Sequence, residues 1–148
     1  MAAKWPLAFK GALQPLRSRM GRDRGFGALA HADIDHLVAE WVKPLLSDFR
    51  IREDLRRLTG SMNPQTLAEA VARFPEFTKP ALIAWSADDA FFPLEDAHRL
   101  VDALPDAQLE MIDHSRTFSM IDRPDRLAEL IADFAGATAE CGRTSVPA

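Results

Sequence analysis

The apolar positions of residues 80–134 are arranged in blocks that predict a strand, a helix, a second strand and a second helix. Residues 81–85 are continuously apolar and are followed by Asp88 and Asp89, a pattern typical of a strand that is covered on both faces. The next apolar residues recur every three or four positions, which predicts a helix with one apolar stripe: Ala97, Leu100, Val101 and Leu104.

The second half of this region repeats the pattern. Residues 108–112 predict a strand, because apolar and polar side chains alternate before the run becomes apolar. A helix is expected after Pro124, with its apolar stripe at Leu127, Leu130, Ile131 and Phe134. Strands joined by a helix pair in parallel, and in open α/β sheets the functional groups lie beyond the carboxyl ends of the strands. Four residues with reactive side chains fall at those ends: Asp88, Asp89, His114 and Thr117.

Residues 1–79 predict helices joined by loops. Asp33 is a suitable N-cap for a helix that Pro44 kinks or divides, and its apolar residues are Ile34, Leu37, Val38, Trp41, Val42 and Leu45. Asn63 caps a later helix, whose inward residues would be Leu67, Ala70 and Val71. We therefore expect a helical segment over residues 1–79, an α/β portion over 80–135 and a disordered tail over 136–148, in which Cys141 has no helical pattern around it.

The stretch KPALIAWSADDAFFPLEDAHRLVDALPDAQLEMIDHSRTFSMIDRPDRLAELIADF resembles the C-terminal end of α/β-hydrolases. In that family a strand ends in G-x-x-D and is followed by a proline, a helix, a strand and a loop of the form G-H-F-P. Aligned without gaps, Asp89 takes the place of the triad acid, Ser86 that of the glycine and Thr117 that of the histidine. The resemblance implies a partial α/β-hydrolase fold, in which two parallel strands with flanking helices are preceded by a helical lid, residues 1–79.

The triad residues that the resemblance assigns are incomplete. In the family the acid orients an imidazole, which takes the proton of the attacking serine. Asp89 suits the first role, but the hydroxyl of Thr117 is not a base near neutral pH, so Thr117 is not a competent substitute. His114 is an alternative base, at the cost of breaking the ungapped register. None of the seven serines lies in a G-x-S-x-G elbow, and the family's oxyanion-hole strand would precede this chain.

Three functions remain open on these residues. The first is the C-terminal part of a hydrolase for an ester or similar small apolar substrate, which is inactive alone and needs its N-terminal half; an upstream reading frame would support it. The alternative is a non-catalytic interaction or oligomerisation module that has kept the fold. The third is an unusual hydrolase that uses Asp89 with His114 and either Ser115 or Ser86. Substrate-binding residues stay unknown, although five side chains would either contact a substrate beneath a lid or pack between helices: Trp5, Phe9, Phe26, Trp41 and Met62.

Charge and composition exclude other classes of function. A net charge of −4 argues against a nucleic-acid partner, and no apolar run is long enough to cross a membrane, so we expect a cytoplasmic protein. One cysteine cannot form an internal disulfide. Metal binding is not expected, because the residues near the strand ends lack a ligand spacing, and neither is a cofactor; His31 and His36 are interpreted as surface residues.

The edge of the first strand predicts association. Residues 81–85 are apolar and contain neither lysine nor proline, the residues that usually protect an exposed edge. We expect this edge to be covered by a second copy in a homodimer, by a swapped partner or by a missing N-terminal half.

Overall fold

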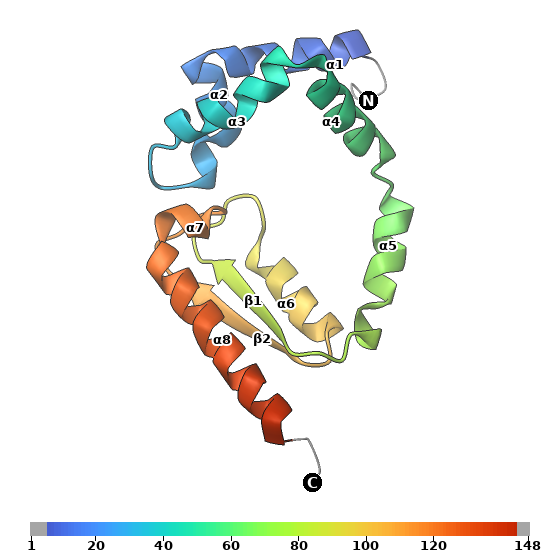
Figure 1. Ribbon diagram of the computed structural model, residues 1–148, viewed down its shortest axis with the longest axis vertical. Coiled ribbons are helices and arrows are strands. Elements are labelled where there is room, and N and C mark those ends of the chain that lie inside the picture. The colour runs from blue at the N-terminus through green and yellow to red at the C-terminus, as the bar shows by residue number, and fades with distance from the viewer. Residues whose placement is uncertain (1–5, 145–148) are drawn as a thin grey trace. The chain divides into compact units, whose positions relative to one another are not determined.

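The computed structural model describes residues 6–144, and its elements belong to two compact units (Figure 1). The first unit holds Ala32–Glu69 and the described residues up to Ala28. The second holds Leu29–His31 and the described residues from Ala70 onward. Within the described part of the chain, no helix has the length and apolar character that crossing a bilayer requires.

The first unit is built from helices. These are α1 (Pro6–Ala12), η2 (Gln14–Arg17), α2 (Arg19–Phe26), α3 (Asp35–Ser47) and α4 (Phe49–Ser61). Two further helices, η3 (Gly27–Leu29) and α5 (Pro64–Ala72), begin in this unit and end in the second. Its buried side chains come at four-residue intervals along the start of α3: Ile34, Val38 and Val42. Ile34, not the predicted Asp33, occupies the N-cap position of α3, although Asp33 accepts a hydrogen bond from the backbone of Asp35 (3.1 Å). Helix α3 continues through Pro44 instead of being divided there.

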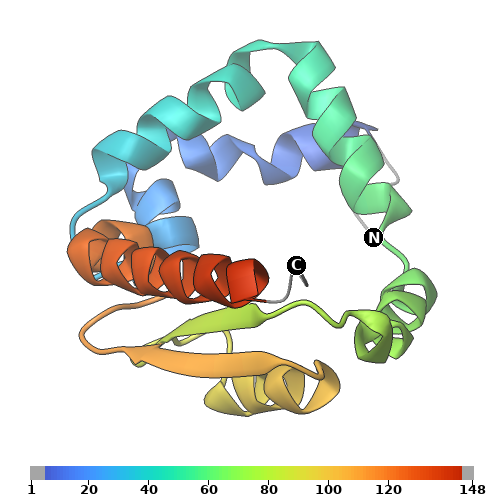
Figure 2. The ribbon, with the colours of Figure 1, turned by 60° about the horizontal axis from the view of Figure 1, so that its bottom comes forward.

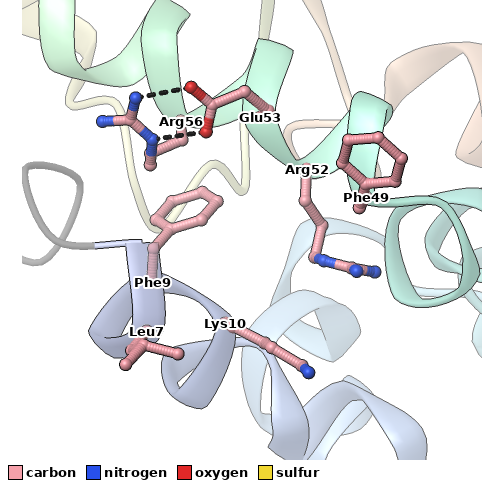
Figure 3. Close-up of a pocket in the computed structure, with 7 residues that line it drawn as sticks. All are labelled: Leu7, Phe9, Lys10, Phe49, Arg52, Glu53 and Arg56. Carbon is pink, nitrogen blue, oxygen red and sulfur yellow. Dashed lines mark hydrogen bonds and ion pairs between the residues drawn. The ribbon is translucent and has the colours of Figure 1, made fainter.

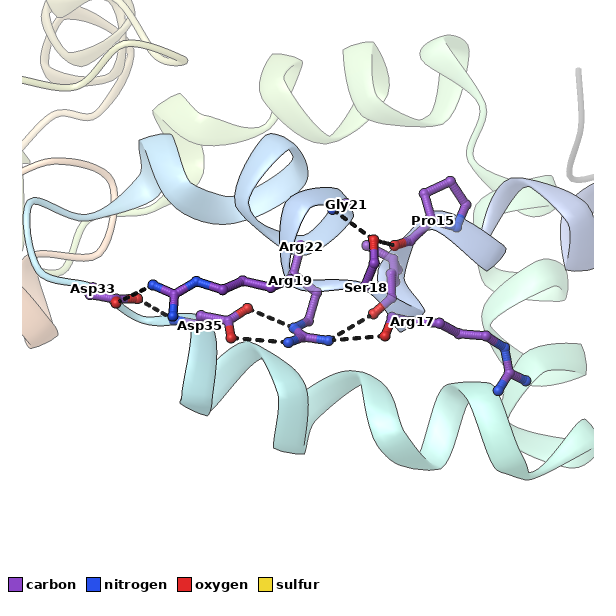
Figure 4. A network of polar contacts seen from close by, with 9 residues as sticks. Pro15, Arg17, Ser18, Arg19, Gly21, Arg22, Asp33 and Asp35 are labelled. Atoms are coloured by element: carbon purple, nitrogen blue, oxygen red, sulfur yellow. Dashed lines mark hydrogen bonds and ion pairs between the residues drawn. The ribbon is translucent and has the colours of Figure 1, made fainter.

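A network of ion pairs and caps connects α2 to the start of α3 (Figure 4). Arg22 donates to both carboxylate oxygens of Asp35, at 2.7 and 3.0 Å, and this hydrogen bonding holds the pKa of the Asp35 carboxyl below its usual value. The hydroxyl of Ser18 caps α2 by accepting from the backbone of Gly21 (3.1 Å). A Cβ at Gly21 would collide with the backbone carbonyl of Pro15, so only glycine fits here.

The second unit contains the sheet. Strands β1 (Ala81–Ser86) and β2 (Ala107–Ile112) are parallel, as predicted, with Ala81 opposite Ala107 and Ser86 opposite Ile112. Helices α6 (Leu94–Ala103) and α8 (Pro124–Thr144) cover opposite faces of the sheet (Figure 2). The short helix η4 (Phe74–Glu76) precedes β1 in the chain, and α7 (Ser119–Asp122) follows β2. The most buried side chains of this unit are Ala30, Ala97, Ile112, Ser115 and Leu130.

One edge of β1 has no neighbouring strand among the described residues. The backbones of Ala81 and Ala87 donate toward the β2 side, to Asp106 (2.8 Å) and Ile112 (3.0 Å). Backbone groups alternate in direction along a strand, so those of Leu82 and Ala84 point to the open edge. Helices α6 and α8 both contact β1, so the strand is covered on both faces as expected, and residues 81–85 are half-buried in this two-stranded sheet.

Two other expectations differ from the structure. Helix α8 extends to Thr144, through most of the tail predicted to be disordered, because residues 125–144 are rich in alanine and lack proline. In α5, Leu67 and Val71 are 63% and 51% exposed, where inward-facing side chains were expected. An apolar stripe identifies the face that favours burial, but another element must be present to cover it.

Candidate functional site

Asp89 lies in the turn that follows β1, at the carboxyl end of the sheet. Its Oδ1 atom accepts hydrogen bonds from the backbones of Phe91 (2.8 Å) and Phe92 (3.0 Å). Aspartate commonly stabilises a turn by accepting from the backbone two or three residues later. The carboxylate thus shapes the chain between β1 and α6, and the side chain stays only half-buried.

Thr117 lies beside that carboxylate. Its hydroxyl donates to Oδ1 of Asp89 across 3.0 Å, which links loops that are 28 residues apart in the sequence. One further contact holds these loops together, because the backbone of Asp88 donates to the carbonyl of Ser115 (3.0 Å). Within the second loop, the hydroxyl of Ser115 donates to the carbonyl of Ile112 (2.9 Å). The structure therefore brings together the two residues to which the resemblance gives the acid and histidine positions.

His114 lies elsewhere in the same loop. It is exposed and occupies the left-handed region, with φ of 54°. Among the described residues, no hydrogen bond joins His114 to Asp89. Ser115 is fully buried and its hydroxyl is already bonded to backbone, so the structure does not assemble Asp89, His114 and Ser115 as a triad.

A histidine from outside the predicted loops reaches this region. The Nε2 atom of His31 lies 2.9 Å from Oδ2 of Asp88, and both side chains are nearly half exposed. The backbone of His31 also donates to the carboxylate of Asp122 (2.8 and 3.1 Å). The interpretation of His31 as a surface residue is confirmed, because it is exposed, but no local pattern in the sequence reveals its contact across 57 residues.

Further contacts hold the short segment that carries His31. Phe118 donates its backbone N–H to the carbonyl of Leu29 (2.8 Å), and the side chain of Arg116 donates to the carbonyl of Ala30 (3.2 Å). The buried side chain of Ala30 adds an apolar contact surface. Segment 29–31 is therefore held against the loop after β2 by backbone, side-chain and apolar contacts.

A small cavity of about 180 Å³ opens beside Asp89 and Thr117. Its lining combines one carboxylate, three hydroxyl groups and two aromatic rings: Asp89, Ser86, Thr117, Ser119, Trp85 and Phe92, together with Ala84. Neither an imidazole nor a cationic side chain is part of that lining. A hydroxyl does not accept a proton at neutral pH, so this set can bind and orient a polar group but contains no general base.

The other candidate residues do not extend this cavity. Trp5 lies outside the described residues, as does the side chain of Cys141. Phe9 lines a separate groove of the first unit, Phe26 is half-buried there, and Trp41 and Met62 are 49% and 67% exposed. Within the described part of the chain, His, Cys, Asp and Glu side chains do not gather in groups of three or more that would hold a metal ion.

Sequence comparison identifies hydrolases as relatives, although no protein-family model matches the chain. A 2-hydroxy-6-oxononadienedioate/2-hydroxy-6-oxononatrienedioate hydrolase of Dechloromonas aromatica is 28% identical over 105 residues, which are 69% of this chain and 36% of the relative. A 2-hydroxy-6-oxo-6-phenylhexa-2,4-dienoate hydrolase of Delftia acidovorans is 30% identical over 77 residues, which are 52% of this chain and 27% of the relative. The chain thus spans about a third of the length of the curated relatives it matches.

Solved structures show the same relationship in the fold. A serine hydrolase involved in carbazole degradation superposes with a TM-score of 0.63 at 20% identity, over 81% of this chain and 48% of that one. A serine hydrolase of the polyaromatic-hydrocarbon-degrading bacterium Cycloclasticus zankles gives a TM-score of 0.62 at 19% identity, over 84% and 47%. The parallel pair, its two covering helices and these matches lead to one conclusion: the chain has a partial α/β-hydrolase fold and corresponds to the C-terminal half of proteins with that fold.

Proposed function

We propose that this chain is the C-terminal part of a serine hydrolase, to which it contributes the acid-bearing loop and a helical lid. The observation that supports this proposal is Asp89 at the carboxyl end of β1, hydrogen-bonded to the residue at the histidine position. The names of the relatives suggest one substrate class, a small molecule such as a 2-hydroxy-6-oxo-dienoate. The sequence alone predicts another, an ester or a similar small apolar substrate.

The isolated chain is proposed to be inactive. Serine attack requires a base that removes the hydroxyl proton and later returns it to the leaving group. Thr117 and the other hydroxyls around Asp89 do not perform that transfer, and the sequence contains no nucleophile elbow. The role of Asp89 in this chain is then structural, while its position is the one an acid would need in a complete site.

The first experiment uses the isolated chain. A serine-directed fluorophosphonate should leave it unlabelled, and p-nitrophenyl acetate and 2-hydroxy-6-oxo-6-phenylhexa-2,4-dienoate should be hydrolysed no faster than in buffer. Asp89→Asn serves as the control, because it removes the acid without changing the size of the side chain. Hydrolysis by the wild-type chain that Asp89→Asn abolishes would contradict the proposal of inactivity.

The second experiment restores the missing parts. This chain would be joined to the N-terminal part of the Dechloromonas aromatica relative, with either Thr117 or Thr117→His. General acid–base catalysis contributes about 10²–10⁴-fold, so the Thr117→His chimera should be faster by that factor. The gain should disappear when Asp89→Asn is added. A folded Thr117→His chimera that is no faster than its Thr117 counterpart would argue against Asp89 as the acid.

An association module is the second candidate function, and the open edge of β1 favours it. The backbone groups of Leu82 and Ala84 point to an edge without a neighbouring strand among the described residues. Such an edge pairs readily with another chain, and we propose a second copy of this one as the partner. Sedimentation equilibrium distinguishes the outcomes, since a dimer supports this candidate and a monomer at 100 μM contradicts it.

A further inference from the structure

A groove of about 330 Å³ lies between α1 and α4, entirely within the first unit (Figure 3). Leu7, Phe9 and Lys10 line it from α1, and Phe49, Arg52, Glu53 and Arg56 line it from α4. The α4 residues are spaced by three, four and seven positions, so they share one face of the helix. The volume lies at the lower end of the range typical of small-molecule sites.

Part of the groove wall is apolar and uncovered. The side chain of Leu7 is 84% exposed and that of Phe49 is 68% exposed. Phe9 is half-buried, and its ring points from α1 toward α4. A ligand with an apolar body would remove this surface from water, which is the main source of affinity at such sites.

The rest of the wall is cationic. Lys10, Arg52 and Arg56 oppose the single carboxylate of Glu53, so the lining has an excess of positive charge in a chain whose net charge is −4. Arg56 already binds Glu53 through two hydrogen bonds of 2.7 and 2.6 Å, and Arg57 adds a third of 3.0 Å. The carboxylate of Glu53 is therefore neutralised by arginines of its own helix, α4.

Two of the cations are placed to meet an anionic ligand. Arg52 is held in position because one of its nitrogens donates to the carbonyls of Leu45 (3.1 Å) and Leu46 (3.0 Å) near the end of α3. A guanidinium has five donors, so others remain for a ligand. The ammonium of Lys10 is exposed and makes neither a hydrogen bond nor an ion pair with the described residues.

We propose that the groove between α1 and α4 binds a small amphipathic carboxylate, with its apolar body against Phe9 and Phe49 and its carboxylate facing Lys10 and Arg52. The positive charges of Lys10 and Arg52 favour a ligand with an anionic group, and the rings of Phe9 and Phe49 favour a ligand with an apolar body. The inference rests on the first unit alone and goes beyond the proposed hydrolase. Its test does not involve Asp89 or Thr117, so the two proposals fail independently.

The test titrates the ¹⁵N-labelled full chain with trans-cinnamate and follows the amide shifts. Cinnamamide is the matched ligand without charge. Cinnamate should bind with a dissociation constant in the millimolar range, should shift amides of α1 and α4, and should bind about threefold more tightly than cinnamamide. This ratio corresponds to a charge contact near a solvent-exposed surface.

Paired variants assign the contacts. Lys10→Gln should weaken cinnamate about threefold, while Lys79→Gln, which removes an exposed lysine of the second unit, should leave the affinity unchanged. Phe49→Ala should weaken both ligands about three- to tenfold, while Phe77→Ala, which removes another exposed ring, should have no effect. Circular dichroism would establish that each variant is folded.

Three results would overturn the inference. They are equal affinity for cinnamate and cinnamamide, equal weakening by Lys10→Gln and Lys79→Gln, and amide shifts confined to residues outside α1 and α4.

Discussion

At the scale of single residues, the contact between Asp89 and Thr117 determines what the carboxyl end of the sheet can do. Oδ1 of Asp89 accepts from one hydroxyl and two backbone N–H groups. Hydrogen bonds to a charged acceptor stabilise loops, but proton transfer needs a group that titrates near neutral pH. The same contact that would orient an imidazole in a hydrolase here fastens one loop to another.

We expect Thr117→Val to destabilise the chain by about 1 kcal/mol, because valine keeps the shape of threonine but removes the donor to Asp89. Urea unfolding followed by circular dichroism measures this change. Thr78→Val is the control, since Thr78 is exposed and makes no hydrogen bond with the described residues. Equal stability of the two variants would show that the contact with Asp89 contributes nothing.

The sequence could predict part of this site. Asp89 and Thr117 follow the two apolar runs, and parallel strands bring such positions together, so their proximity follows from the pattern. His31 was missed because its contact with Asp88 depends on how residues 57 positions apart meet. The polar residues around it give no periodic signal, and only the folded chain reveals the pair.

At the scale of elements, helix α2 depends on a close approach between two backbone segments. Gly21 lies against the carbonyl of Pro15, and Ser18 caps the same helix turn. The sequence predicted helices in this region but not the contact, because a glycine inside a helix usually weakens it and gives no sign of what lies nearby.

We expect Gly21→Ala to destabilise the chain by about 1–3 kcal/mol, since its Cβ would force apart the backbone at Pro15. Gly25→Ala, in the same helix, should instead be neutral or stabilise by up to about 1 kcal/mol, because its Cβ meets only Leu16 at an ordinary distance of 3.7 Å. Thermal unfolding of both variants measures the difference. A loss of similar size in both variants would contradict the collision assigned to Gly21, because alanine favours the helix at either position.

Helix α4 carries a pH-dependent interaction. The hydrogen bonds from Arg56, with the one from Arg57, lower the pKa of the Glu53 carboxyl from 4.5 to about 2. A depressed pKa adds stability above pH 4.5, and this contribution is lost as the pH falls from there toward 2. Glu53→Gln should therefore be less stable than wild type at pH 7, and the difference should shrink between pH 4.5 and 2.

Unfolding midpoints of both proteins across this pH range measure the effect of Glu53. Glu69→Gln is the matched control, because Glu69 is exposed on α5 and makes no hydrogen bond with the described residues. A wild-type advantage over Glu53→Gln that persists unchanged at pH 2 would contradict the assigned titration.

At the scale of the whole chain, much apolar surface remains uncovered. Exposed side chains include Phe49, Met62, Leu67, Phe91 and Ile131, and β1 has an open edge. Periodicity predicted which residues form apolar stripes, but not which stripes are buried, since Trp41, Leu67 and Ile131 of those stripes are exposed. A partial fold that spans about a third of its curated relatives is expected to leave such surface.

Association through the β1 edge makes a directional prediction. Ala84→Pro removes an N–H that points away from β2, so it should keep the β1–β2 pair and convert the proposed dimer to a monomer. Ile83→Pro removes an N–H on the β2 side and should unfold the second unit. Sedimentation with circular dichroism measures both effects. A dimer that survives Ala84→Pro would place the interface elsewhere.

The anchoring of segment 29–31 has a consequence for synthesis on the ribosome. His31 donates to Asp122, which lies 91 residues later in the chain. At roughly 5–20 residues per second, translation produces Asp122 about 5–18 s after His31. During that interval the loop after β2, which holds segment 29–31 in the folded chain, has not yet been made. The contact between His31 and Asp122 must therefore form late, after α6 and β2 have emerged.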